Sequence, residues 1–98
     1  MDPSTVVVRI EHAVPNFEKW KEAFDRDPAD RKGSGVRHYR VLRSQADPNF
    51  VMIDLEFASR GEAEAFMVVM ERIWGGPAKA IMLNPRARIA EIVEAREL

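Results

Sequence analysis

His12 is the residue with the clearest chemical potential, because it stands between a β-branched run and an aromatic segment in HAVPNFEKWKEAFD. An imidazole exchanges its proton near neutral pH, so a histidine beside an apolar pocket can act as a general base toward an acidic phenol. The alternative is a packed histidine that hydrogen-bonds the corner between a strand and a helix and orders Trp20. Buried polar groups usually have such structural partners. The sequence therefore favours the packed role, with His12 kept as the candidate catalytic base.

Several side chains have the character needed to hold a flat ligand, because aromatic rings and thioethers adapt to planar molecules. Most of them follow one another at helical spacing in the second half of the chain, where such residues more often form core. Trp74 stands out because it precedes the Gly75-Gly76 break, where a pocket could open. The predicted ligand-binding residues are Tyr39, Phe66, Met70 and Trp74.

Composition excludes several other classes of function. The 98 residues contain no cysteine, which rules out disulfides and thiolate chemistry. The sequence offers no glycine-rich phosphate loop, no metal-ligand spacing and no serine in a nucleophile setting, so we expect neither a cofactor nor a metal. With 15 basic and 16 acidic side chains, the formal charge of −1 provides no field for nucleic acid.

Two further features concern the surface and location of the protein. The first four residues lack the basic and apolar regions of a signal peptide, and no apolar run reaches membrane-spanning length, so we expect a cytoplasmic protein without a membrane role. Basic residues gather before and within the central hairpin, but aromatic platforms are not interleaved with them. We predict that they form solvated surface: Arg31, Lys32, Arg37, Arg40 and Arg43.

The first half of the chain has clear signals for its elements. Residues 5–14 alternate as a strand, with Val8, Ile10 and His12 on one face. Pro15 ends that strand, and Asn16 is suited to cap a helix that carries aromatic residues on one side. Residues 36–43 and 50–57 then form a hairpin, whose predicted register sets Arg40 opposite Asp54. Polar and apolar side chains thereby separate onto opposite faces of the sheet.

The second half has one ambiguous segment. Ser59 and Glu62 have capping-box spacing, which predicts a helix from there to about Trp74. A short apolar piece at residues 78–83 and an Asn84-Pro85 turn follow. Residues 86–98 fit both a helix and a strand; we predict a strand, because it completes a four-stranded sheet, with Ile89 and Val93 on one side and Ile92 on the other. The expected fold is a single α+β domain over residues 1–98, a ferredoxin-like β-α-β-β-α-β sandwich.

The segments VVVRIEHAVPNFEKWKEAFD, GSGVRHYRVLR, ADPNFVMIDLEF and SRGEAEAFM resemble the dimeric α/β barrel superfamily, specifically antibiotic biosynthesis monooxygenase-like proteins, over roughly residues 5–70. That resemblance implies a homodimer in which two four-stranded antiparallel sheets pair into a barrel with the helices outside. It also implies a range of activities, from cofactor-free oxygenation of phenols and polyketide quinols to haem breakdown or no chemistry. The haem-degrading branch has an asparagine on the first strand and a tryptophan and a histidine around the second helix. Trp74 matches that tryptophan, but Arg9, Ile10 and Glu11 provide no asparagine and no histidine follows His38, so the sequence argues against haem breakdown.

Two functions are therefore expected in competition. The first is a small-molecule-binding homodimer that acts as a cofactor-independent monooxygenase on a phenolic or polyketide-like substrate, with His12 as the base and Tyr39 and Trp74 positioning the ring. The second is a non-catalytic ligand-binding or dimerisation module. No convergent acid–base pair stands out in the sequence, which favours the second.

Overall fold

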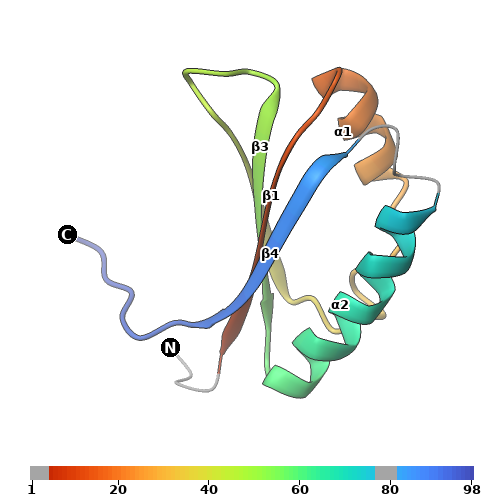
Figure 1. Ribbon diagram of the computed structural model, residues 1–98. Helices are drawn as coiled ribbons and strands as arrows, with labels where there is room; N and C mark the ends of the chain where they lie inside the picture. Colours follow the sequence, from red (N-terminus) through yellow and green to blue (C-terminus); the bar gives the residue numbers. More distant parts are fainter. Residues whose placement is uncertain (1–4, 77–81) are drawn as a thin grey trace.

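The computed structural model describes residues 5–76 and 82–98. Its elements are β1 (Val6–Ala13), α1 (Phe17–Asp25), β2 (His38–Arg43), β3 (Phe50–Phe57), α2 (Arg60–Gly75) and β4 (Leu83–Glu91). The four strands form one antiparallel sheet in the order β2-β3-β1-β4, and both helices cover the same face of that sheet (Figure 1). The predicted ferredoxin-like sandwich is confirmed.

The core lies between the sheet and the helices, because each central strand alternates apolar and polar side chains. Val8, Ile10 and His12 of β1 are buried, whereas Arg9 between them is exposed. Val51, Ile53, Leu55 and Phe57 of β3 face the same layer. The helices add Trp20, Ala63 and Phe66 to this core.

Both helix starts have the caps expected from the sequence. The Asn16 side chain accepts a hydrogen bond from the backbone N–H of Lys19 at 3.0 Å. The Ser59 hydroxyl accepts from the backbone N–H of Glu62 at 3.2 Å and donates to the Glu62 carboxylate at 3.3 Å. These contacts satisfy N–H groups that the first turn of a helix leaves without an intrahelical partner.

The outer face of the sheet, opposite the helices, is organised around Asp54. The predicted hairpin register is confirmed, since His38 pairs with Glu56 and Arg40 with Asp54. Arg9 on β1 donates two hydrogen bonds to the Asp54 carboxylate, at 2.7 and 2.9 Å, and Arg40 on β2 donates a third at 3.0 Å. The two arginines cover Asp54, which is only 5% exposed. One carboxylate thus links three neighbouring strands.

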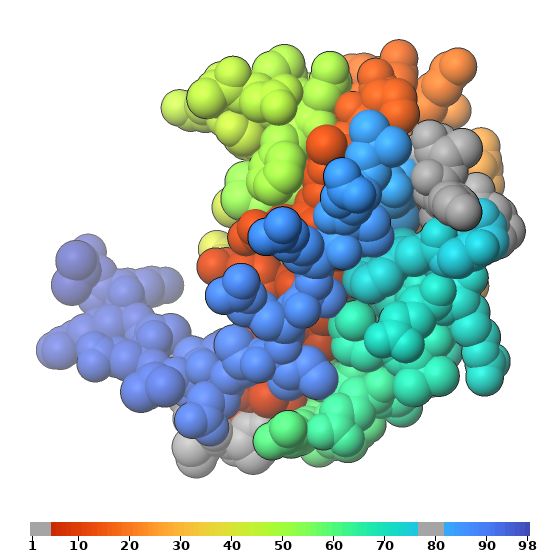
Figure 2. Space-filling model, viewed as in Figure 1, coloured from red at the N-terminus to blue at the C-terminus, as the bar shows by residue number. Residues whose placement is uncertain are grey.

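The C-terminal segment confirms one prediction and corrects two. It forms a strand, β4, and not a helix. The Asn84-Pro85 turn is wrong, because both residues lie inside β4, where the pairing with β1 shifts between Glu11 and Ala13 and Asn84 has a φ of 52°. This β-bulge replaces the turn. The strand also ends at Glu91, so Ile92 and Val93 lie beyond it. The backbone N–H of Ile92 still donates to the carbonyl of Thr5 at 3.3 Å, and Figure 2 shows the C-terminal end of the chain standing away from the rest of the molecule. Most of the predicted apolar piece at residues 78–83 lies outside the described residues.

Asp54→Asn is expected to lower the free energy of unfolding by about 1–2 kcal/mol, because two arginines lose their shared carboxylate. Hydrogen bonds from Arg9, outweighing the effect of burial, hold the pKa of Asp54 below its usual 3.8. The contribution is therefore present above about pH 3.8 and is lost as the pH falls further. Urea unfolding at one fixed protein concentration measures both effects.

The control is Asp25→Asn, which breaks the exposed pair between Lys21 and Asp25. Exposed pairs one helical turn apart contribute about 0.3–0.5 kcal/mol. Equal losses for the two variants would contradict the linking role of Asp54.

Candidate functional site

The aromatic side of α1 holds this helix above the sheet. Trp20 is buried at 3% exposure, and its ring centroid lies 5.9 Å from that of Phe17 and 5.2 Å from that of Phe24. These rings are large enough that no Cα atom of α1 comes within 8 Å of one in α2 or in any described strand. Side chains alone therefore fill the layer between α1 and the sheet.

A small apolar cavity of about 70 Å³ remains in that layer. Its walls come from the sheet, from both helices and from the loop after α1. All but one of the lining side chains are apolar; they are Ile10, Trp20, Ala23, Phe24, Pro28, Ala29, Arg31, Ile53, Leu55, Phe66, Met70, Ile73 and Met82. An engineered apolar cavity of about 150 Å³ admits benzene, so this cavity must enlarge before an aromatic ring can enter.

His12 lies at the end of β1 and is 1% exposed. Its Nδ1 donates to the carbonyl of Ala13 at 3.1 Å, which leaves Nε2 as the nitrogen with the lone pair. Nε2 is buried and has no hydrogen-bond partner among the described residues. Burial lowers the pKa of His12 below its usual 6.5, against the opposing effect of the Ala13 carbonyl. The imidazole is therefore neutral at neutral pH, in the state that a base requires.

The path from His12 to the cavity passes through Trp20. The two rings meet edge to face with centroids 5.5 Å apart, and Trp20 lines the cavity while the described lining does not include His12. β4 pairs with every residue of β1 except His12, which stands opposite the bulge. His12 thus occupies a corner behind the cavity wall, with its Nδ1 engaged and its Nε2 unpaired.

The four predicted ligand-binding residues do not meet in one place. Phe66 and Met70 line the cavity from α2. Tyr39 is 46% exposed and lines a separate cleft, although its ring packs against that of Phe24. Trp74 packs against the core with its indole N–H buried and unpaired among the described atoms, and it does not line either space. The roles of these residues remain predictions.

Arg31 was predicted to be solvated, and this prediction is wrong. Its side chain is only 14% exposed, and its guanidinium carbon lies 3.9 Å from the ring centroid of Phe24 and 4.8 Å from that of Tyr39. No local spacing reveals this, because Tyr39 reaches Arg31 only after the chain has turned from the loop into β2. Arg31 also lines an open, mixed-charge cleft of about 690 Å³ with Asp27, Lys32, Gly35, Val36, Arg37, Tyr39 and Glu62.

Two properties of the described residues limit the partners that the site suggests. Within residues 5–76 and 82–98, no helix combines the length and apolarity needed to cross a lipid bilayer. In the same ranges, no three acidic, histidine or cysteine side chains gather into a metal-binding group.

No family model matches the sequence, and no curated protein matches it. Solved structures do match, across nearly the whole chain. A mutant of SnoaB, a cofactor-independent oxygenase from Streptomyces nogalater, is 10% identical with a TM-score of 0.77, covering 94% of this chain and 96% of SnoaB. A candidate antibiotic biosynthesis monooxygenase from Nitrosomonas europaea is 16% identical with a TM-score of 0.73, covering 95% and 94%.

A third similar structure is a dimeric ferredoxin-like protein from an uncultured marine organism, 13% identical with a TM-score of 0.73, covering 94% of this chain and 98% of that one. At these identities the shared feature is the fold. The fold is therefore ferredoxin-like, of the kind found in antibiotic biosynthesis monooxygenase-like proteins, as the sequence resemblance implied.

The buried, neutral His12 is expected to make the protein less stable in mild acid. Because its folded-state pKa lies below 6.5, the unfolded chain binds the proton more readily; stability is full above about pH 6.5 and falls as the pH drops toward the folded pKa. The slope approaches about 1.4 kcal/mol per pH unit for one proton.

Urea unfolding of the wild type and of His12→Asn between pH 5 and 8 checks this expectation. The variant should lose the slope, whereas His38→Asn, which changes an exposed imidazole, should keep it. A slope that persists in His12→Asn would assign it to another group.

Proposed function

We propose that the protein binds a small planar phenol between its sheet and helices and oxygenates it without a cofactor. The observation that carries this proposal is that Nε2 of buried His12 has no partner among the described residues, while the neighbouring Trp20 lines an apolar cavity. Unsatisfied buried polar atoms are uncommon and often have a chemical role. The fold shared with a cofactor-independent oxygenase supports the same reaction class.

Ligand entry requires the cavity to enlarge. Met70 is the most adaptable of the predicted ligand-binding residues, because an unbranched thioether repacks at low energetic cost. Trp20 must also turn, since it stands between the cavity and His12. In this arrangement the ligand ring replaces contacts that Phe66 and Met70 now make with other side chains of the cavity wall.

The chemistry needs only a base and dioxygen. His12 Nε2 takes the phenolic proton, and the electron-rich phenolate then reacts with dioxygen. Dioxygen bonds to a ring carbon of the phenolate that bears one hydrogen. The O–O bond then breaks, that carbon becomes a carbonyl, and one water leaves with the ring hydrogen and the phenolic one, so phenol and dioxygen give a quinone and water and the substrate supplies all the electrons. His12 returns its proton to the oxygen that leaves as water. No external reductant enters this balance.

The competing function is a non-catalytic ligand-binding or dimerisation module. The hydrogen bond from His12 to Ala13 and the packing against Trp20 favour it, because both describe a corner-stabilising residue. That role accounts for Nδ1 but leaves Nε2 without a partner within residues 5–76 and 82–98, which is why we place the catalytic proposal first.

Two substitutions at His12 separate these roles. An asparagine amide can replace Nδ1 and keep the bond to Ala13, whereas a glutamine amide extends toward the position of Nε2. If Nε2 is the base, His12→Asn should lose oxygen uptake with a responsive phenolic substrate by roughly 10²–10⁴-fold. Its free energy of unfolding should stay closer to the wild-type value than that of His12→Gln, which lacks the Nδ1 bond and loses about 1–3 kcal/mol.

Oxygen-electrode rates and urea unfolding on the same preparations give both quantities. Oxygen uptake retained in His12→Asn would rule out the base. If oxygen uptake falls only as far as the fraction of folded protein falls, the corner-stabilising role of His12 is supported.

We further propose that the outer face of the sheet pairs with a second copy of the chain. Arg9 and Arg40 have side chains 51% and 71% exposed, and Leu42 on the same face is 37% exposed. A chain this short gains stability by burying such surface against a partner. The dimeric ferredoxin-like protein of the same fold supports this assembly.

Leu42→Asp is expected to weaken the dimer by about 3 kcal/mol, or roughly 100-fold in dissociation constant, because it places an unpaired charge in the interface. Val68→Asp on α2 is the matched control, since Val68 is 51% exposed on the helical side. Light scattering over micromolar concentrations measures the dissociation. A wild-type monomer, or equal effects of the two variants, would contradict the proposed interface.

A further inference from the structure

Arg31 stands at the boundary between the cavity and the cleft. It is the charged side chain among the cavity residues, and it also lines the cleft of about 690 Å³. The cleft lies within the size range of small-molecule sites, about 300–1,000 Å³. A ligand that extends from one space into the other must therefore pass this guanidinium.

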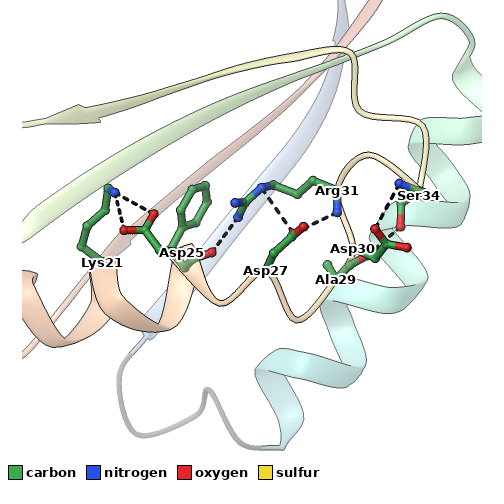
Figure 3. Close-up of polar contacts among 9 residues, drawn as sticks. Lys21, Asp25, Asp27, Ala29, Asp30, Arg31 and Ser34 are labelled. Carbon is green, nitrogen blue, oxygen red and sulfur yellow. Dashed lines mark hydrogen bonds and ion pairs between the residues drawn. The ribbon is translucent and has the colours of Figure 1, made fainter.

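The loop after α1 holds Arg31 in position, as Figure 3 shows. The backbone N–H of Arg31 donates to the Asp27 carboxylate at 2.9 Å, and Nη1 donates to the carbonyl of Phe24 at 2.8 Å. Ser34 closes the same loop by donating its hydroxyl to the carbonyl of Ala29 at 2.7 Å. The guanidinium is thus fixed in place before any ligand arrives, which lowers the entropy cost of binding to it.

The charge of Arg31 is only partly neutralised by Asp27. Their ion pair is long, 3.4 Å from Nε to Oδ1. This pair and the bond to Phe24 engage two of the five N–H donors of a guanidinium. Phe24 and Tyr39 contact the guanidinium from adjacent directions, since their own centroids lie 5.5 Å apart, which leaves its remaining N–H donors open to an incoming oxygen. The charged residues that line the cleft are three cations, Arg31, Lys32 and Arg37, and two acids, Asp27 and Glu62. One positive charge is therefore in excess.

We propose that Arg31 is the anion-binding residue of this site, and that it binds the ionised hydroxyl of a planar phenol whose ring lies in the apolar cavity. This inference rests on the proposed function and narrows its substrate class to phenols that bind as phenolates. The cavity has the apolar wall that a ring requires, and Arg31 supplies the charge at its edge. Arg31 is a binding residue here, while His12 remains the candidate base.

This role favours ionisation of the hydroxyl that Arg31 binds. A fixed cation lowers the pKa of a nearby phenol, because it stabilises the phenolate and not the neutral form. Hydrogen bonds to charged groups contribute enough to change affinity by about 10-fold or more. The same interaction places the electron-rich ring at the cavity, where dioxygen must reach it.

Two probes of similar shape test this proposal: 4-nitrophenol, whose coloured phenolate reports ionisation, and 4-nitroanisole, which cannot ionise. With the full chain, the pKa of bound 4-nitrophenol should fall by about one pH unit relative to the free probe. Arg31→Met should abolish that shift and weaken phenolate binding by about 10-fold. The affinity for 4-nitroanisole should be the same in both proteins.

Asp27→Asn is the matched variant, and it should change the phenolate affinity in the opposite direction to Arg31→Met. It keeps an oxygen to accept the backbone N–H of Arg31 but removes the competing charge, so phenolate binding should become several-fold tighter. Should Arg31→Met disturb the loop enough to lose 4-nitroanisole as well, Asp27→Asn decides, since unchanged phenolate affinity in that variant would overturn the proposal.

The outcomes also separate this inference from the proposed function. If neither probe binds the wild-type protein, the ligand site itself fails. If both probes bind and Arg31→Met changes neither, the site stands and the anion-binding role of Arg31 is overturned.

Discussion

The spacing of α1 from the sheet is the constraint on which the rest of the helical side depends. Phe17, Trp20 and Phe24 keep the helix too far away for direct backbone packing, so the layer is made of side chains alone. Burial of one large aromatic side chain of about 150–250 Å² contributes about 4–6 kcal/mol, which makes this separation stable. Trp20 and Phe24 also line the cavity, Phe24 contacts Arg31, and Trp20 contacts His12. Stability and ligand binding therefore depend on the same residues.

The two faces of the sheet have different roles, because successive side chains of a strand point to opposite faces and the sequence alternates mainly between apolar and polar residues. On the inner face, apolar residues and His12 pack against the helices. On the outer face, Asp54 joins Arg9 and Arg40 across three strands. Arg9 also stands opposite Arg88 of β4, so the cationic side chains outnumber their shared carboxylate locally. Neither face can take over the other's role, since a one-residue change of register would exchange them.

The sequence predicted what periodicity and local capping determine, and it missed what only the assembled fold brings together. Alternation and the caps at Asn16 and Ser59 were sufficient for the order of elements and for the pairing of Arg40 with Asp54. The burial of His12 followed from its position in that alternation. Arg31 was missed because its ring partners come from different elements, and the Asn84-Pro85 turn was wrong because turn-forming residues also build bulges. The cavity depends on how well several side chains fit together, which spacing does not encode.

The bulge in β4 constrains where the chain can gain or lose a residue during evolution. Between Glu11 and Ala13 the chain advances by two residues, while β4 advances by three from Leu83 to Arg86. Deleting one residue there would restore equal steps and keep Leu83, now 43% exposed, on the outer face with Arg86, since the two would then be two positions apart. The one residue left between Leu83 and Arg86 would then stand opposite His12, which has no partner in β4 now. Relatives that lose or gain a residue at this point must therefore remodel the histidine corner as well.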